Sequence, residues 1–157
     1  MFSAAWELGL VQSIIPETFG GVGETPSAIT GALVCEELAW GDLAIAFHML
    51  TPRLVIQPVI ALGTEEQQQQ VLPTYAGASF TAGTAAVMEP CFGFEVNEFA
   101  TTATVRNGDF LLNGAKCYVP LAADAQHLLI YAQGTDGPAA FLVPRDTPGL
   151  SVTERKK

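Results

Sequence analysis

Residues 63–90 read GTEEQQQQVLPTYAGASFTAGTAAVMEP, and the secondary structure is expected to change from helix to strand within this stretch. Thr64 and Gln67 match the capping box, a pattern that predicts the start of a helix. The apolar residues that follow this helix recur with a period of two, which is typical of strands. A boundary near residue 80 therefore separates a helical domain, residues 1–80, from a β-domain, residues 81–157.

The residues before this stretch also carry helix signals. Thr25 is expected to be an N-cap with Pro26 at the first helical position, and Gly41 is expected to end that helix. Asp42 is expected to cap the next helical segment, in which residues 43–60 are apolar on every face. A helix that is apolar all round is predicted to be buried on all sides.

The residues after position 80 predict a set of short strands. Strands are expected at Thr101–Arg106, Asp109–Asn113, His127–Ala132, Ala139–Val143 and Leu150–Thr153. Asn107-Gly108 predicts a type I′ hairpin turn, because both central residues of that turn need positive φ. Helices followed by strands indicate an α+β fold, with an N-terminal all-α domain and then a small antiparallel β-sheet or barrel domain.

The composition excludes two classes of protein. The chain has 157 residues, of which 49% are hydrophobic and 15% are charged, and a mean hydropathy of +0.31. It can therefore bury a core and is not disordered. Its net charge is −9 and its pI is about 4.4, so we expect no nucleic acid partner.

The sequence offers no pattern of metal ligands. Cys35, Cys91 and Cys117 are odd in number and far apart, which favours neither a disulfide framework nor a zinc knuckle. His48 and His127 have no neighbour at metal-ligand spacing, so no metal is predicted. Free cysteines fit a reducing compartment, and a cytoplasmic location is expected.

The residues from 43 to 63 come nearest to a membrane span, with Arg53 as their single charge. Arg53, Pro52 and Pro58 would each be unfavourable in hydrocarbon, so a helix buried in protein is expected instead of a membrane span. Three apolar helices and one small sheet give too few layers to cover one another. We therefore expect further protein to pack on this chain, either another domain or the partner subunits of a homo- or hetero-oligomer.

Six segments, in this order, resemble the acyl-CoA dehydrogenase family. They are Trp6–Leu10, Pro16–Gly23, Cys35–Ala39, Gly63–Gln67, Val87–Pro90 and Asn113–Val119. Each motif is weak alone, but together they span nearly the whole chain. The resemblance implies the family's N-terminal helical domain and middle β-domain, followed by a C-terminal four-helix domain that this sequence does not contain.

The resemblance also implies a reaction. Family members use FAD to take a hydride from the β-carbon of an acyl-CoA thioester, and later pass electrons to an electron-transfer flavoprotein. A carboxylate of the C-terminal domain removes the α-proton in these enzymes, so we assign no catalytic residue in this chain. The same resemblance places Ile56, Gln57 and Val59 beside the acyl chain of the substrate.

The resemblance implies seven cofactor-binding residues, and three of them differ from the residues usual in the family. The seven are Val87, Met88, Gly93, Phe94, Tyr118, Val119 and Pro120. Met88, Phe94 and Pro120 stand where the family usually has hydroxyl residues. If each lost hydrogen bond contributes about 0.5 to 1.5 kcal/mol, the three losses together weaken FAD binding by one to three orders of magnitude, roughly.

Three functions stay open from the sequence. The first is an acyl-CoA dehydrogenase fragment that is inactive as this isolated polypeptide, and the second is a non-catalytic, flavin-free subunit of a heteromeric complex. The third is a carrier of an apolar ligand, for which only the apolar residues 43–60 argue.

Overall fold

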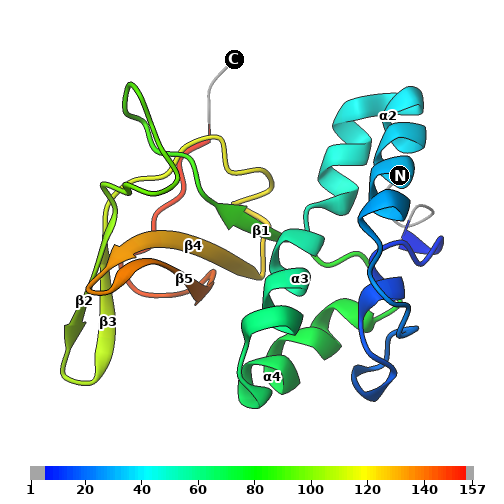
Figure 1. Ribbon diagram of the computed structural model, residues 1–157, viewed down its shortest axis with the longest axis horizontal. Helices are drawn as coiled ribbons and strands as arrows, with labels where there is room; N and C mark the ends of the chain where they lie inside the picture. The colour runs from blue at the N-terminus through cyan, green and yellow to red at the C-terminus, as the bar shows by residue number, and fades with distance from the viewer. Residues whose placement is uncertain (1–5, 155–157) are drawn as a thin grey trace. The chain divides into compact units, whose positions relative to one another are not determined.

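The structure is a computed structural model that describes residues 6–154. The chain divides into two compact units, Met1–Gly83 and Thr84–Lys157. The first unit is helical and the second contains most of a β-sheet (Figure 1). The α+β class predicted from the sequence is therefore confirmed.

Among the described residues, the structure gives bounds for two short 3-10 helices and three α-helices in the helical unit. They are η1 (Gln12–Ile14), η2 (Glu17–Phe19), α2 (Ala28–Leu50), α3 (Arg53–Leu62) and α4 (Glu65–Ala76). At α4 the predicted capping box is formed, because the Thr64 side chain accepts from the Gln67 N–H and the Gln67 side chain accepts from the Thr64 N–H. These two bonds satisfy backbone groups that would otherwise lack a partner at the start of the helix.

Helix α2 differs from its prediction at its start and agrees with it in the middle. The N-cap is Ser27 and not Thr25, because the Ser27 hydroxyl accepts from the Thr30 N–H at 3.2 Å. Asp42 has non-helical φ and ψ, and its carboxylate accepts from the Ile45 N–H at 2.9 Å. Asp42 therefore caps a second helical segment across a kink, as the sequence predicts.

The core of the helical unit lies on α3 and α4, which run side by side in Figure 1. Its buried side chains on these helices are Val55, Ile56, Val59, Val71, Leu72 and Tyr75. A Cβ placed on Gly83 would lie 2.9 Å from Cζ of Tyr75, so the absence of a side chain there lets the chain pass close to that ring. The predicted burial on all sides is wrong for α2, where Leu43 and Phe47 are exposed.

Membrane-spanning potential is limited to one bent pair of helices. Within residues 6–154, no single helix combines the length and apolarity needed to cross a bilayer. Helices α2 and α3 meet the criterion only when they are taken together, across a bend of 49°.

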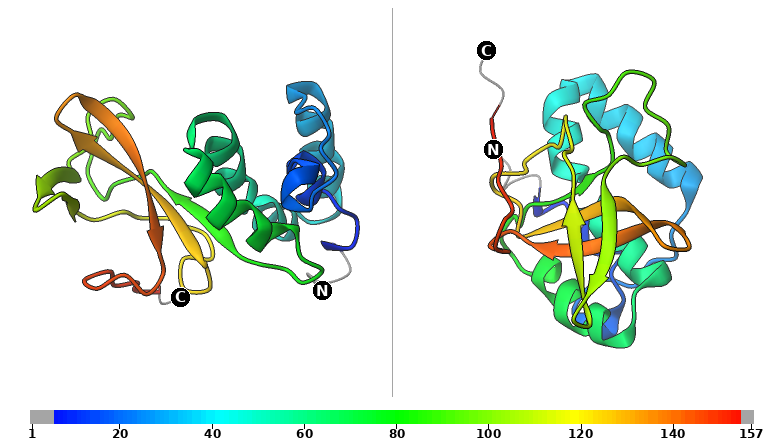
Figure 2. Two further views of the ribbon diagram at one scale, coloured as in Figure 1. Left: turned by 90° about the horizontal axis from the view of Figure 1, so that it is seen from below. Right: turned by 90° about the vertical axis from the view of Figure 1, so that its left-hand side faces the viewer.

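Within the described residues, a sheet of five strands lies mostly in the second unit. The strands are β1 (Gly83–Ala86), β2 (Thr102–Arg106), β3 (Asp109–Asn113), β4 (His127–Gly134) and β5 (Gly137–Pro144). The β2–β3 and β4–β5 pairs are antiparallel hairpins, whereas β2 and β4 are parallel and pair at Thr102 and Gln133. The sheet is therefore mixed, and Figure 2 shows its two hairpins crossing at a steep angle.

The turn between β2 and β3 follows the sequence prediction. Asn107 has φ of 56° and Gly108 has φ of 90°, so both central residues are in the left-handed region that a type I′ turn needs. The register places Arg106 opposite Asp109 across this two-residue loop.

The predicted strand at Leu150–Thr153 is not formed. These residues are irregular, although Leu150 packs against the buried cluster that includes Leu128, Ile130 and Val143. Its N–H donates to the Thr147 carbonyl in a local turn and not to a strand. The alternation of apolar residues at 150–153 therefore reflects packing of Leu150 on the core, without hydrogen bonding to a neighbouring strand.

Candidate functional site

Two loops of the β-sheet unit are joined by hydrogen bonds. The first follows β1 and includes Val87 and Met88; the second follows β3 and includes Lys116 and Cys117. The Cys117 N–H donates to the Met88 carbonyl at 2.9 Å, and the Lys116 ammonium donates to the Val87 carbonyl at 3.1 Å. Segments far apart in the sequence, and both quoted in the resemblance, therefore lie together.

A buried ion pair between Lys116 and Glu89 also joins the two loops. The Lys116 Nζ lies 2.8 Å from Oε1 of Glu89, and the two side chains are 8% and 2% exposed. Glu89 also accepts from the Ala100 N–H at 2.7 Å and from the Thr101 N–H at 2.8 Å. Because a buried charge is costly unless it is paired and hydrogen-bonded, this set of donors is what lets Glu89 stay ionised.

The pKa of Glu89 reflects these contacts. Burial raises the pKa of this carboxyl, but the hydrogen bonds from Lys116, Thr101 and Ala100 outweigh burial and lower the pKa to about 2 from an ordinary value of 4.5. Glu89 is therefore a fixed anion at neutral pH and unsuited to accept a proton as a general base.

An aromatic cluster covers the ion pair. The Lys116 ammonium lies 4.2 Å from the centre of the Phe99 ring, a cation–π distance. Phe94 packs on the same ring at 5.9 Å between centroids, and Tyr131 packs on it at 6.3 Å. Phe94, predicted to contact a cofactor, is thus half-buried against Phe99.

The other predicted cofactor-binding residues lie on the same two loops. Met88 and Tyr118 are exposed, and Tyr118 has a positive φ of 52°. Gly93 is also exposed, with φ of 74°, whereas Val119 and Pro120 are half-buried. The Met88 carbonyl accepts a hydrogen bond from the N–H of Cys117, and Tyr118 is the next residue along the chain. The backbone of Met88 therefore lies close to the backbone that carries Tyr118.

The chemistry of these loops fits the ring of a flavin but not every polar part of the cofactor. Tyr118 offers an exposed aromatic side chain, and Met88 on the other loop is exposed as well. The carbonyls of Val87 and Met88 already accept hydrogen bonds from the second loop. Side-chain hydroxyls are absent at Met88, Phe94 and Pro120, so binding would depend on stacking and backbone contacts.

The residues predicted to line the acyl chain lie on α3. Ile56 and Val59 are buried in the core of the helical unit, and Gln57 is exposed. Gln57 is therefore the member of this set that a ligand could reach at the surface of this chain. The three assignments stay predictions.

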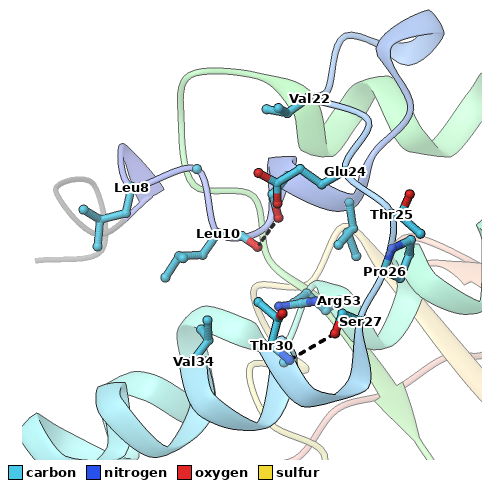
Figure 3. Close-up of a pocket in the computed structure, with 14 residues that line it drawn as sticks. Leu8, Leu10, Val22, Glu24, Thr25, Pro26, Ser27, Thr30, Val34 and Arg53 are labelled. Carbon is cyan, nitrogen blue, oxygen red and sulfur yellow. Dashed lines mark hydrogen bonds between the residues drawn. The ribbon is translucent and has the colours of Figure 1, made fainter.

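The helical unit also has an open hollow that the sequence does not predict. It encloses about 430 Å³ beside the first turn of α2, and Figure 3 shows Glu24, Thr30 and Arg53 among its lining residues. Arg53 is the single basic residue among residues 1–80, and it forms no ion pair with Glu24. None of the predicted site residues lines this hollow.

The remaining candidate ligands are dispersed. All three cysteines are free, with Cys35 and Cys91 exposed and Cys117 half-buried. Within residues 6–154, no three His, Cys, Asp or Glu side chains gather as metal ligands would. Burial lowers the pKa of His127.

Sequence reasoning did not assign a role to Glu89, Lys116 or Phe99. Glu89 and Lys116 stand inside two of the quoted motifs, and a lysine between Ala115 and Cys117 in an acidic chain is a signal that could have suggested a buried pair. Phe99 carries no such signal, because its place over Lys116 depends on the folded sheet unit.

Solved structures that share this fold include dehydrogenases with a bound flavin cofactor. A glutaryl-CoA dehydrogenase from Mycobacterium smegmatis in complex with FADH2 matches with a TM-score of 0.83 and 29% identity, over 100% of this chain and 41% of that one. An acyl-CoA dehydrogenase from Bacillus anthracis complexed with FAD matches with a TM-score of 0.80 and 29% identity, over 99% of this chain and 27% of that one.

The chain belongs to the acyl-CoA dehydrogenase family. Residues 1–79 match the family's N-terminal domain, and residues 84–157 match its middle domain. A glutaryl-CoA dehydrogenase from Desulfococcus multivorans is 30% identical over 158 residues, which cover 96% of this chain and 40% of that protein. The chain thus spans about two fifths of the length of the curated relatives it matches.

Proposed function

We propose that this chain supplies the helical and β-sheet domains of a protein that dehydrogenates an acyl-CoA thioester between its α and β carbons. The observation that carries the proposal is the hydrogen-bonded pair of loops, in which the Cys117 N–H binds the Met88 carbonyl and the next residue, Tyr118, is exposed. Relatives of the chain are acyl-CoA and glutaryl-CoA dehydrogenases, and some of their structures contain FAD or FADH2.

In this proposal the two loops hold FAD, which when bound accepts a hydride from the substrate. Backbone groups of Val87, Met88, Gly93 and Val119 would meet its polar edge, and Tyr118 would stack on its ring. Phe94 and Pro120 would add apolar contact without hydrogen bonds. The buried ion pair of Glu89 would keep the loops in place and take no proton.

The substrate side of the proposal uses the helical unit. The acyl chain would lie along α3 at Gln57, with Ile56 and Val59 supporting that surface from within the core. An electron-transfer flavoprotein would reoxidise the cofactor, and further protein would cover the chain in a homo- or hetero-oligomer. The free cysteines support a cytoplasmic location for the protein in this proposal.

The polypeptide of residues 1–157 alone is proposed to be inactive. Removing the weakly acidic α-proton of a thioester needs a base in a dry site next to a polarised carbonyl. No carboxylate of this chain is assigned that task, and Glu89 is already paired. Incubation with FAD, a redox dye and acyl-CoA thioesters of several lengths should give no dye reduction; steady reduction would disprove this part of the proposal.

A flavin-free subunit of a heteromeric complex is the second candidate. The substitutions at Met88, Phe94 and Pro120 favour it, because they remove side-chain hydrogen bonds from the cofactor site. Colour separates the two functions. A purified protein with the visible absorbance of oxidised flavin supports the enzyme, and a colourless protein whose unfolding temperature does not respond to added FAD supports the flavin-free subunit.

A further inference from the structure

We propose that Glu89 and Lys116 are positioning residues, which hold the two cofactor-contacting loops in one register. The inference builds on the proposed function, because the loops matter for the cofactor only if the protein binds flavin. Neither side chain is expected to touch the flavin, since both are almost fully buried.

The register is specified by three acceptors in a row. Val87, Met88 and Glu89 each accept a hydrogen bond from Lys116 or Cys117, through two backbone carbonyls and one carboxylate. Shifting one loop by one residue would break all three bonds together. A single contact could tolerate such a slip, but a consecutive set of three cannot.

Both members of the ion pair are held by further contacts. Glu89 is held by the N–H groups of Ala100 and Thr101, which directly precede β2. Lys116 is confined by Phe99 above its ammonium group. The ion pair therefore ties both loops to the start of β2, and a strand within a sheet is stiffer than a loop.

The hydrogen bonds also determine the positions of Tyr118 and Met88, which neighbour the bonded residues. Tyr118 follows Cys117 directly and is exposed with positive φ, a conformation that its neighbours must maintain. Met88 lies between the two residues whose acceptors bind Lys116. Fixing Lys116 thus fixes the spacing between the backbones of Met88 and Tyr118, and a cofactor that contacts both loops needs that spacing.

The first test measures the loops in the protein without cofactor. Hydrogen exchange is compared between the unmodified protein, Lys116→Met and the double variant Glu89→Gln/Lys116→Met, with the exposed Glu95→Gln as control. The double variant leaves no unpaired buried charge, so it is expected to fold. We expect exchange of the Cys117 amide to be at least about tenfold faster in both Lys116 variants, with β4 and the control unchanged.

Two results of this test would overturn the inference. One is a Cys117 amide that stays as protected in the double variant as in the unmodified protein. The other is a loss of protection that is equal in β4 and in the loops, because this would make the pair a general stabiliser of the domain and not a device for loop position.

The second test adds FAD. In a protein that binds it, the double variant should raise the dissociation constant at least about tenfold and alter the visible flavin spectrum, while Glu95→Gln changes neither. An unchanged affinity and spectrum would contradict the inference. If the unmodified protein binds no FAD, the proposed enzyme function fails, and hydrogen exchange still decides whether the pair sets the loop register.

Discussion

At the scale of single residues, Glu89 shows how burial and bonding set the charge of a side chain. Its carboxylate accepts three hydrogen bonds, and its pKa of about 2 lies below the ordinary value of 4.5. A lowered pKa means that folding favours the charged form, so the stabilisation is fully present above pH 4.5 and is lost as the pH falls towards 2.

We therefore predict a pH-dependent difference between the unmodified protein and Glu89→Gln. The variant should be less stable near neutral pH, because it leaves the Lys116 charge buried without its partner. The difference should shrink as the pH falls from 4.5 towards 2, where Glu89 itself becomes neutral. Urea unfolding across this range measures it, and a difference that is constant with pH would contradict the assignment.

At the scale of elements, α2 shows that a helix can continue past a break when the break is capped. Asp42 leaves helical geometry, and its side chain takes over the Ile45 N–H that the preceding turn no longer binds. Gly41 precedes it, in agreement with the predicted end of the first helical segment. The kink thus divides α2 into two helical segments.

Asp42→Ala should destabilise the helical unit by about 1 kcal/mol, because the Ile45 N–H loses its capping acceptor. Glu37→Ala is the matched control, since Glu37 is an exposed acid on the same helix and has no capping role. Thermal unfolding followed by circular dichroism measures both variants. Equal stability of Asp42→Ala and the unmodified protein would show that water replaces the cap without cost.

At the scale of the whole chain, an apolar stripe on α2 is left uncovered. This stripe consists of Ile29, Leu33, Trp40, Leu43 and Phe47, all of them exposed, and Trp40 is 92% exposed. The prediction that the chain cannot cover its own helices agrees with this exposure. Large apolar side chains that are exposed repeatedly along one helix are typical of a surface that packs on other protein.

We predict that the isolated chain self-associates through the α2 apolar stripe. The double variant Trp40→Ser/Leu43→Ser should weaken association by at least about tenfold, because burial of one large apolar side chain contributes about 1.5 to 3 kcal/mol. Light scattering after gel filtration, over a range of concentrations, gives the oligomeric state. Glu37→Ser should behave as the unmodified chain, and a chain that is monomeric at every concentration would contradict the prediction.

Local interactions are what the sequence determines by itself. The capping box at Thr64 and Gln67, the cap at Asp42 and the turn at Asn107-Gly108 each depend on residues within three positions of one another. Side-chain periodicity then separates helices from strands, and this gives the fold class. The same signals fail at Leu150–Thr153, because alternation shows which residues face a core and not whether a neighbouring strand is there to pair.

Only the tertiary structure decides which distant groups meet. Glu89 and Lys116 stand 27 positions apart and form a pair because the hairpin of β2 and β3 lies between them and brings the chain back to the loop after β1. The burial of Ile56 against the exposure of Gln57 likewise depends on how α3 packs with α4. Interactions between residues close in sequence determine the helices, strands and turns. The candidate site depends on contacts between residues far apart in sequence, and these contacts form only when the sheet is assembled.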